Sequence, residues 1–147
     1  MILGNITKED VSKFDLLVLS PGISVNAPIA QMFRDQEKPV WSEIELAYQA
    51  SKGRIAAITG TNGKTTTTAL TGEIMKGYYE SSFVVGNIGI PYTSVALDTK
   101  EDSVTTAEIS SFQLETIVDF KPDVCAVLNI TPDHLDRHGT VEVYAQT

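Results

Sequence analysis

The sequence of 147 residues has a single cysteine, few basic residues and no long apolar run. Cys125 cannot form a disulfide within the chain, and its apolar neighbours predict a buried, inert thiol. No apolar stretch approaches the roughly 18 residues that a membrane-spanning helix needs. The first residues also lack a basic segment followed by an apolar core, so we expect no signal peptide and no membrane partner. These absences favour a reducing, cytoplasmic setting.

Basic residues are outnumbered, because 11 Lys and Arg face 19 Asp and Glu and leave a net charge of −8. A nucleic-acid backbone is therefore not an expected partner. The hydrophobic share of 42% and the charged share of 20% are typical of a soluble globular protein. Any nucleotide-binding site in so acidic a chain has to concentrate positive charge locally.

One stretch predicts such a site, namely a buried strand, a glycine loop and a helix. Residues 54–59 form the expected strand, and residues 64–78 form the expected helix, with Leu70, Ile74 and Tyr78 at helical spacing. The loop and helix start contain the candidate nucleotide-binding residues Gly60, Thr61, Asn62, Gly63, Lys64, Thr65 and Thr66.

Each residue type in this loop has a physical reason to hold phosphate. Gly60 and Gly63 let the backbone turn sharply, and amides at the helix start face an anion. Lys64 adds a mobile positive charge, and the Thr65 hydroxyl can bind a Mg²⁺ that bridges phosphates. The general phosphate-loop pattern has a glycine where Ile58 stands, so this is a shorter variant, Gly-x-x-Gly-Lys-Thr. An ordinary strand–turn–helix junction is the alternative.

Polar residues also follow or end three other predicted strands. Asn87 follows strand 82–85, Glu108 lies near the end of strand 103–109, and His134 follows strand 123–130. A carboxylate is rarely buried unless it is paired or binds metal, so Glu108 is a candidate Mg²⁺ ligand, with a solvated edge residue as the alternative. The order of elements predicts an α/β fold with a doubly wound, mainly parallel sheet, which would gather these residues at its carboxyl edge.

A smaller α/β unit is expected before this sheet. Its strand, 14–19, ends in the turn Ser20-Pro21-Gly22, which is either a ligand-binding edge or a plain strand-ending turn. Helices are expected at 28–36 and 43–50, the second with Ser42 and Glu45 as a capping box. The punctuation at 51–53 predicts a boundary between a Rossmann-like part, 1–52, and a second domain, 53–147.

The last third of the chain contains two further local patterns. Ser110 and Gln113 have capping-box spacing, which predicts a helix through Leu114 and Ile117. His134 and His138 would share a helix face, but no third nitrogen or sulfur ligand is apparent, so we do not favour zinc. The sequence instead favours His134 acting singly, with Asp136 and Arg137 as a local ion pair and Thr131 as the N-cap.

Taken together, segments 59–66, 86–89, 108–115 and 133–137 resemble the motif series of the Mur ligase family, which makes amide bonds in bacterial cell-wall precursors. Segment 108–115 is most similar to the branch of that family that adds D-glutamate. Ser20-Pro21-Gly22 resembles the turn that this branch places near its UDP-sugar. The shortened glycine loop is normal for this family.

The resemblance implies an ATP-dependent ligase that joins D-glutamate to UDP-N-acetylmuramoyl-L-alanine through an acyl phosphate. It implies that Lys64 and the loop amides bind the ATP phosphates, that Thr65 and Glu108 hold one Mg²⁺, and that His134 helps to hold a second. Lys64, Glu108 and His134 are then the catalytic candidates. The implied substrate contacts are Ser20, Pro21, Gly22, Asn87, Ser110 and Gln113.

Family members have three domains, so the resemblance also implies that this chain covers the end of the first domain and the start of the second. We therefore expect the chain alone to be inactive and a full-length protein to be active. Three alternatives stay open: another Mur-type or folylpolyglutamate-type ligase, a nucleotide-binding module without ligase chemistry, and a fragment with only a folding role.

Overall fold

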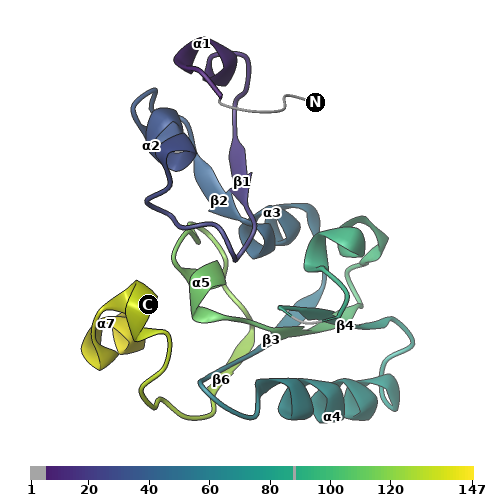
Figure 1. Ribbon diagram of the computed structural model, residues 1–147. Helices are drawn as coiled ribbons and strands as arrows, with labels where there is room; N and C mark the ends of the chain where they lie inside the picture. The colour runs from purple at the N-terminus through teal and green to yellow at the C-terminus, as the bar shows by residue number, and fades with distance from the viewer. Residues whose placement is uncertain (1–5, 88) are drawn as a thin grey trace.

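The computed structural model describes residues 6–87 and 89–147 and contains two parallel sheets, which lie on either side of helix α3 (Figure 1). The expectation of no signal peptide concerns residues 1–5, which lie outside the described residues, as does Ile88 of segment 86–89. Among the described residues, no helix combines the length and the apolar character that crossing a membrane requires.

The first sheet has two parallel strands, β1 (Leu17–Leu19) and β2 (Val40–Ser42), flanked by helices α1 (Lys8–Val11) and α2 (Pro28–Arg34). Proline at the first position starts α2, since its missing N–H would have no helical partner there. Ala30 and Phe33 of α2 are buried together with Leu19. The turn Ser20-Pro21-Gly22 follows β1, at the carboxyl edge of this small sheet.

The second sheet has four parallel strands in the order β4-β5-β3-β6. The strands are β3 (Arg54–Thr59), β4 (Ser82–Gly86), β5 (Val104–Glu108) and β6 (Val124–Val127). Because all four run in the same direction, their carboxyl ends meet at one edge. The glycine loop, Asn87 and Glu108 all follow or end these strands, so their predicted gathering at that edge is confirmed, whereas that of His134 stays a prediction.

Helices cover both faces of this sheet, as expected for a doubly wound fold. Helix α4 (Lys64–Lys76) packs on β3, β4 and β5 on one face (Figure 1). On the other face α3 (Glu43–Ala50) and the 3₁₀ turns η1 (Tyr92–Ser94) and η2 (Ala96–Asp98) contribute to the core. That core is built from Ile44, Ala47, Ile55, Ala57, Val85, Tyr92, Ala96, Ala107, Ile109 and Phe120.

Helix α3 starts at Glu43 as predicted, but not with the predicted capping box. The Ser42 side chain makes no capping hydrogen bond. Glu45 is fully buried and instead accepts hydrogen bonds from the backbone N–H groups of Val118 (2.8 Å), Asp119 (3.1 Å) and Phe120 (3.0 Å). The Glu45 carboxylate therefore binds backbone N–H groups far along the chain instead of the N–H group of Ser42 at the start of its own helix. The boundary at 52/53 stays a prediction, although α3 packs into the core of the second sheet.

Helix α4 ends at Lys76, so Tyr78 of the predicted helix 64–78 lies beyond it, and the three apolar residues at helical spacing do not face the sheet. Leu70, Ile74 and Tyr78 are 62%, 51% and 83% exposed, so the apolar face that their spacing suggested is wrong. Thr68 and Gly72 are buried instead. An added Cβ at Gly72 would lie 2.2 Å from Val84 Cγ2, so small residues let the helix approach β4 closely.

Strand β6 is an edge strand rather than a covered one. Its span, Val124–Val127, is shorter than predicted, and Val124 and Val127 are 66% and 59% exposed. Cys125 is also exposed, which overturns the expectation of a buried thiol. An apolar run shows that a strand can be covered, but it does not show that a neighbour is present.

Three short helices complete the fold, α5 (Ser111–Leu114), α6 (Leu135–His138) and α7 (Val141–Gln146). The capping box of Ser110 and Gln113 is confirmed, but α5 ends at Leu114 and does not reach Ile117. The N-cap of α6 is His134, with φ 50°, so the predicted start at Thr131 is wrong. Instead, the carbonyl oxygen of Thr131 accepts a hydrogen bond from the Thr61 hydroxyl at 3.2 Å.

Candidate functional site

The glycine loop turns sharply between β3 and α4. Gly60 and Gly63 adopt φ of 132° and 85°, values that side chains with a Cβ rarely adopt. A Cβ at Gly60 would lie 2.9 Å from the carbonyl oxygen of Asn129, so this glycine also permits close contact with the chain after β6. Both glycines therefore have the conformational role that the sequence predicted.

Asn129 holds this loop, although it is not among the residues predicted from the sequence. Its side-chain oxygen accepts the Asn62 N–H at 2.9 Å, and its side-chain nitrogen donates to the Asn62 carbonyl at 2.8 Å. The Asn129 carbonyl also accepts the Thr61 N–H at 2.9 Å. An amide at the end of a predicted apolar strand was the available signal, because a polar residue there needs a partner.

Lys64 lies over the loop that precedes it. Its Nζ donates to the carbonyl oxygens of Gly60 (2.7 Å) and Thr61 (3.0 Å). Thr65 and Thr66, at the start of α4, are exposed. A flexible ammonium group above open helix-terminal amides is suited to charge neutralisation of a phosphate group.

Glu108 ends β5 directly beside the strand that leads into the loop, paired with Ile58 in register. It is only 2% exposed, so the alternative of a solvated edge residue is wrong. Its one side-chain hydrogen bond among the described residues comes from Asn87 Nδ2, at 3.3 Å. A buried carboxylate with one long, neutral hydrogen bond is a group that a cation would stabilise.

Gly86 brings β4 against Glu108. An added Cβ would lie 2.0 Å from the Glu108 carbonyl oxygen, and φ is 128°. The Asn87 N–H donates to that same carbonyl at 2.9 Å. The glycine that the sequence associated with close approach therefore approaches the backbone of Glu108.

The residues fit a magnesium ion that arrives with a nucleotide better than a resident metal. Within residues 6–87 and 89–147, no three His, Cys, Asp or Glu side chains gather as a metal site. Mg²⁺ is commonly held by one or two protein oxygens together with phosphates and water. Glu108 and the Thr65 hydroxyl are oxygen donors of that kind.

His134 lies in a left-handed conformation, φ 50° and ψ 33°, which costs a residue with a Cβ about 1 kcal/mol. Its side chain is 50% exposed, and its ring lies 4.8 Å from that of Phe112. No hydrogen bond or ion pair among the described residues joins it to Glu108. Its role toward a metal stays a prediction.

His138 differs from His134 in its burial and in its hydrogen-bond partners, although the Phe112 ring lies near both. It is 8% exposed, and its Nε2 lies 3.0 Å from the Ser111 hydroxyl. Its Nδ1 lies 3.7 Å from Glu115.

The Ser110 N–H donates to Gln113 Oε1 at 3.0 Å, so these two candidate substrate contacts also bind each other.

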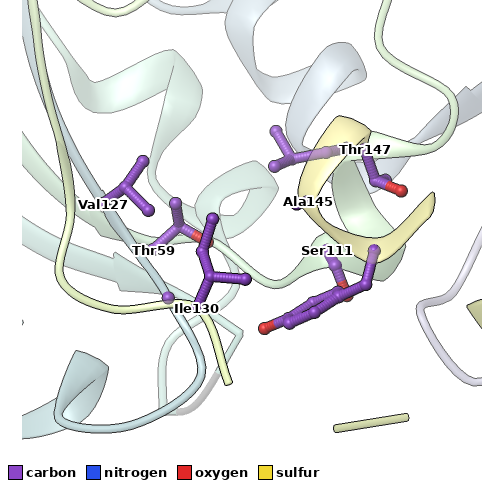
Figure 2. A pocket seen from close by; sticks show the side chains of 9 residues that line it. Thr59, Ser111, Val127, Ile130, Ala145 and Thr147 are labelled. Carbon is purple, nitrogen blue, oxygen red and sulfur yellow. The ribbon is translucent and has the colours of Figure 1, made fainter. Parts of the chain in front are cut away.

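Helix α7 lies beside the glycine loop. The Tyr144 hydroxyl is 3.1 Å from the Thr61 hydroxyl. Figure 2 shows the space between them, with Thr59, Val127 and Ile130 on one side, and Ala145 of α7 and Thr147, which follows that helix, on the other. This cavity measures about 100 Å³, whereas small-molecule sites usually measure about 300 Å³ or more. The cavity is therefore too small to enclose a nucleotide.

The predicted local ion pair between Arg137 and Asp136 is wrong. Arg137 pairs with Glu115, with Nε 3.1 Å from Oε1. Its Nη1 donates to the Pro21 carbonyl at 2.8 Å, which places the turn Ser20-Pro21-Gly22 against α6. The candidate residues thus form two groups, one around the glycine loop and Glu108 and one around this turn.

A parallel sheet with helices on both faces and a lysine-bearing glycine loop at its carboxyl edge defines an α/β protein whose architecture is typical of nucleotide-binding domains. The family model described as "Mur ligase middle domain" matches residues 58–147. This match covers more than half of the chain, which therefore belongs to the Mur ligase family.

Relatives support the same placement. The chain is 60% identical over 147 residues to a UDP-N-acetylmuramoylalanine–D-glutamate ligase of Lachnospira eligens, covering 100% of this chain and 33% of the relative. It is 59% identical over 146 residues to the ligase of that name from Lachnoclostridium phytofermentans, with 99% and 32% covered. The ligase of that name from Alkaliphilus metalliredigens is 52% identical over 147 residues. The chain spans about a third of the length of these curated relatives.

Proposed function

We propose that this chain supplies the ATP side and part of the UDP-sugar side of a ligase that joins D-glutamate to UDP-N-acetylmuramoyl-L-alanine. Relatives that are 52–60% identical carry the name of that reaction, which supports the choice of substrates. The observation that carries the chemistry is the buried carboxylate of Glu108, in register with the strand that enters the glycine loop.

In the proposed site, the ammonium group of Lys64 and the loop amides bind the β- and γ-phosphates of ATP, except the amides of Thr61 and Asn62, which already donate to Asn129. Glu108 and Thr65 hold the accompanying Mg²⁺, which neutralises charge on the phosphates. His134 contributes to a second Mg²⁺. Lys64 has to leave the carbonyl oxygens of Gly60 and Thr61 to reach a phosphate, and its flexible side chain permits this movement.

The proposed reaction has two steps. The alanyl carboxylate of the UDP-sugar substrate attacks the γ-phosphorus, which gives an acyl phosphate and ADP. The amine of D-glutamate then attacks the acyl carbon, and phosphate leaves as the amide forms. Ser20, Pro21, Gly22, Asn87, Ser110 and Gln113 are proposed to position the UDP-sugar substrate. The protein's part is positioning and charge neutralisation, so no protein nucleophile is required.

The test is phosphate release by the complete ligase, measured with ATP, UDP-N-acetylmuramoyl-L-alanine and D-glutamate, each omitted in turn. We expect release to require all three. Lys64→Ala should lower kcat by about 10³-fold, because it removes a charge that faces the transferring phosphate. Lys52→Ala is the matched control, because Lys52 pairs with Glu101 on the surface and is 61% exposed.

Each other outcome identifies an alternative. Release that needs neither UDP-sugar nor amino acid would indicate a nucleotide-binding module without ligase chemistry. Release with a different amino acid would indicate another ligase of the superfamily. Full activity of Lys64→Ala would remove the glycine loop from the mechanism.

A further inference from the structure

The guanidinium group of Arg137 lies where three distant segments meet. Its Nε donates to Glu115 Oε1 at 3.1 Å, and its Nη2 contacts the second oxygen of the same carboxylate. Its Nη1 donates to the Pro21 carbonyl at 2.8 Å, and Nη2 also reaches the Ile23 carbonyl at 3.3 Å. Pro21 is 116 residues away in sequence, so only the tertiary structure creates this junction.

The geometry requires an arginine rather than any cation. The guanidinium group is planar and presents donors in a fixed fork, which lets one side contact a carboxylate while the other contacts two carbonyls. Its carbon Cζ also lies 4.0 Å from the centre of the Phe112 ring, which is a cation–π distance. A lysine ammonium group at this place could satisfy only part of the set.

The ion pair of Arg137 and Glu115 is largely shielded from solvent, so its hydrogen bonds contribute to holding the segments together. The side chains of Arg137 and Glu115 are 17% and 13% exposed. Hydrogen bonds to charged groups contribute more than neutral ones, and exposure this low reduces screening. A cleft of about 450 Å³ lined by Val25, Arg137 and His138 opens beside the pair. Arg137 therefore lies at a cleft between segments rather than in the core of the second sheet.

Arg137 thereby fixes the turn after β1 relative to the rest of the site. Pro21 belongs to the turn Ser20-Pro21-Gly22, and Phe112, beneath the guanidinium group, also contacts the ring of His134. One side chain thus connects the small sheet with α5 and α6. Nothing else in the described hydrogen bonds reaches the Pro21 carbonyl.

We propose that Arg137, held by Glu115, is a positioning residue for the UDP-sugar substrate: it sets the distance between the turn Ser20-Pro21-Gly22 and the phosphate-transfer site. The inference rests on the proposed function, since it takes that turn as part of the UDP-sugar site. Arg137 itself need not touch either substrate. Loss of the contact lets the turn move away, which weakens binding of the UDP-sugar substrate and leaves the glycine loop unchanged.

The experiment measures the KM of the complete ligase separately for UDP-N-acetylmuramoyl-L-alanine and for ATP. Arg137→Ala and Arg137→Lys should each raise the KM for the UDP-sugar substrate by about tenfold or more, while the KM for ATP changes by less than about twofold. Glu115→Gln should act in the same direction with a smaller effect. Lys76→Ala, which removes a surface pair at the end of α4, is the control and should change neither value.

Backbone hydrogen exchange gives a readout without substrates. Amides of residues 20–25 should exchange faster in Arg137→Ala, whereas amides of residues 60–66 should keep the wild-type rate. If Arg137→Ala does not fold, Arg137→Lys and Glu115→Gln provide the same comparison, because both keep the size and polarity of the side chain.

The outcomes separate this inference from the function on which it rests. If the wild-type ligase does not consume the UDP-sugar substrate, the proposed function is wrong. If the wild type does ligate but the variants leave the KM for that substrate unchanged, Arg137 does not position it. Equal increases in both KM values would show a general structural role and would equally overturn the proposal.

Discussion

Asn129 shows how one side chain can preorganise a loop that lacks partners of its own. The first N–H groups of a helix have no helical partner, and a loop that presents such groups to a ligand needs support from elsewhere in the chain. Asn129 supplies it with two side-chain hydrogen bonds to Asn62 and one backbone hydrogen bond to Thr61. The loop is thereby shaped before a phosphate arrives, which lowers the cost of ordering it on binding.

Replacing Asn129 by alanine should weaken ATP binding by about tenfold, because two hydrogen bonds contribute about 1–2 kcal/mol. Titration calorimetry of Mg²⁺-ATP binding to the complete ligase measures the change. Asn26→Ala is a matched control, since Asn26 is an exposed loop residue. Unchanged affinity in Asn129→Ala would mean that the loop keeps its shape without this contact.

Gly86 is a second position where one residue decides the geometry. A methyl group there would meet the Glu108 carbonyl at 2.0 Å, in a backbone conformation with φ of 128°. We expect Gly86→Ala to destabilise the fold by about 3 kcal/mol, from backbone strain and displacement of β5. Denaturant unfolding checks the value. Gly22→Ala is the comparison for stability alone, because nothing lies within 4 Å of its added Cβ.

Among the secondary-structure elements, α3 is fixed to the second sheet by its apolar side chains and by Glu45. The carboxylate accepts hydrogen bonds from three successive backbone N–H groups in the segment after α5. Desolvation on burial raises the pKa of Glu45, but the hydrogen bonds from Val118, Gln49, Phe120 and Asp119 outweigh it and leave the pKa below its ordinary value. The charged form is therefore the form that stabilises the fold.

This contact predicts a pH dependence. Because the pKa of Glu45 is lower in the folded state than in the unfolded state, its stabilisation is complete above the unfolded pKa of about 4.3 and is lost as the pH falls through the folded pKa. At pH 7, Glu45→Gln should lower the free energy of unfolding by about 2–4 kcal/mol, since buried N–H groups lose a charged acceptor. Denaturant unfolding at pH 7 and at a pH below the folded pKa of Glu45 measures this effect. The difference in unfolding free energy between wild type and variant should be smaller at the acidic pH. A difference independent of pH would contradict a role for the charge.

At the scale of the whole molecule, the candidate residues divide between two substrates. The glycine loop and Glu108 are assigned to ATP and Mg²⁺, and the turn after β1 to the UDP-sugar, but no residue is assigned to D-glutamate. We therefore expect the 147-residue chain by itself to bind Mg²⁺-ATP and to form no amide. Fluorescent-nucleotide binding and product analysis test the two halves of this expectation. Robust ligation by the chain alone would contradict it.

Local patterns predicted the elements well where the partners are also local. The bounds of α3 and β3 and the capping box at Ser110 depend on residues a few positions apart. Predictions failed where a distant partner competed. Glu45 bonded to residues 118–120 instead of its own helix start, and Arg137 bonded to Glu115 and Pro21 instead of Asp136.

The sequence by itself determined the parallel α/β pattern and the positions of the glycine loop, Asn87 and Glu108 at strand ends, because strand order and turn chemistry are written in local residue types. It could not determine which surfaces are covered, as Cys125 and Leu70 show, since burial depends on neighbours far along the chain. Nor could it identify the partners of Asn129 and Arg137, which lie 67 and 116 residues away. Only the folded chain brings those atoms within hydrogen-bonding distance, and those contacts decide how the two parts of the candidate site are held together.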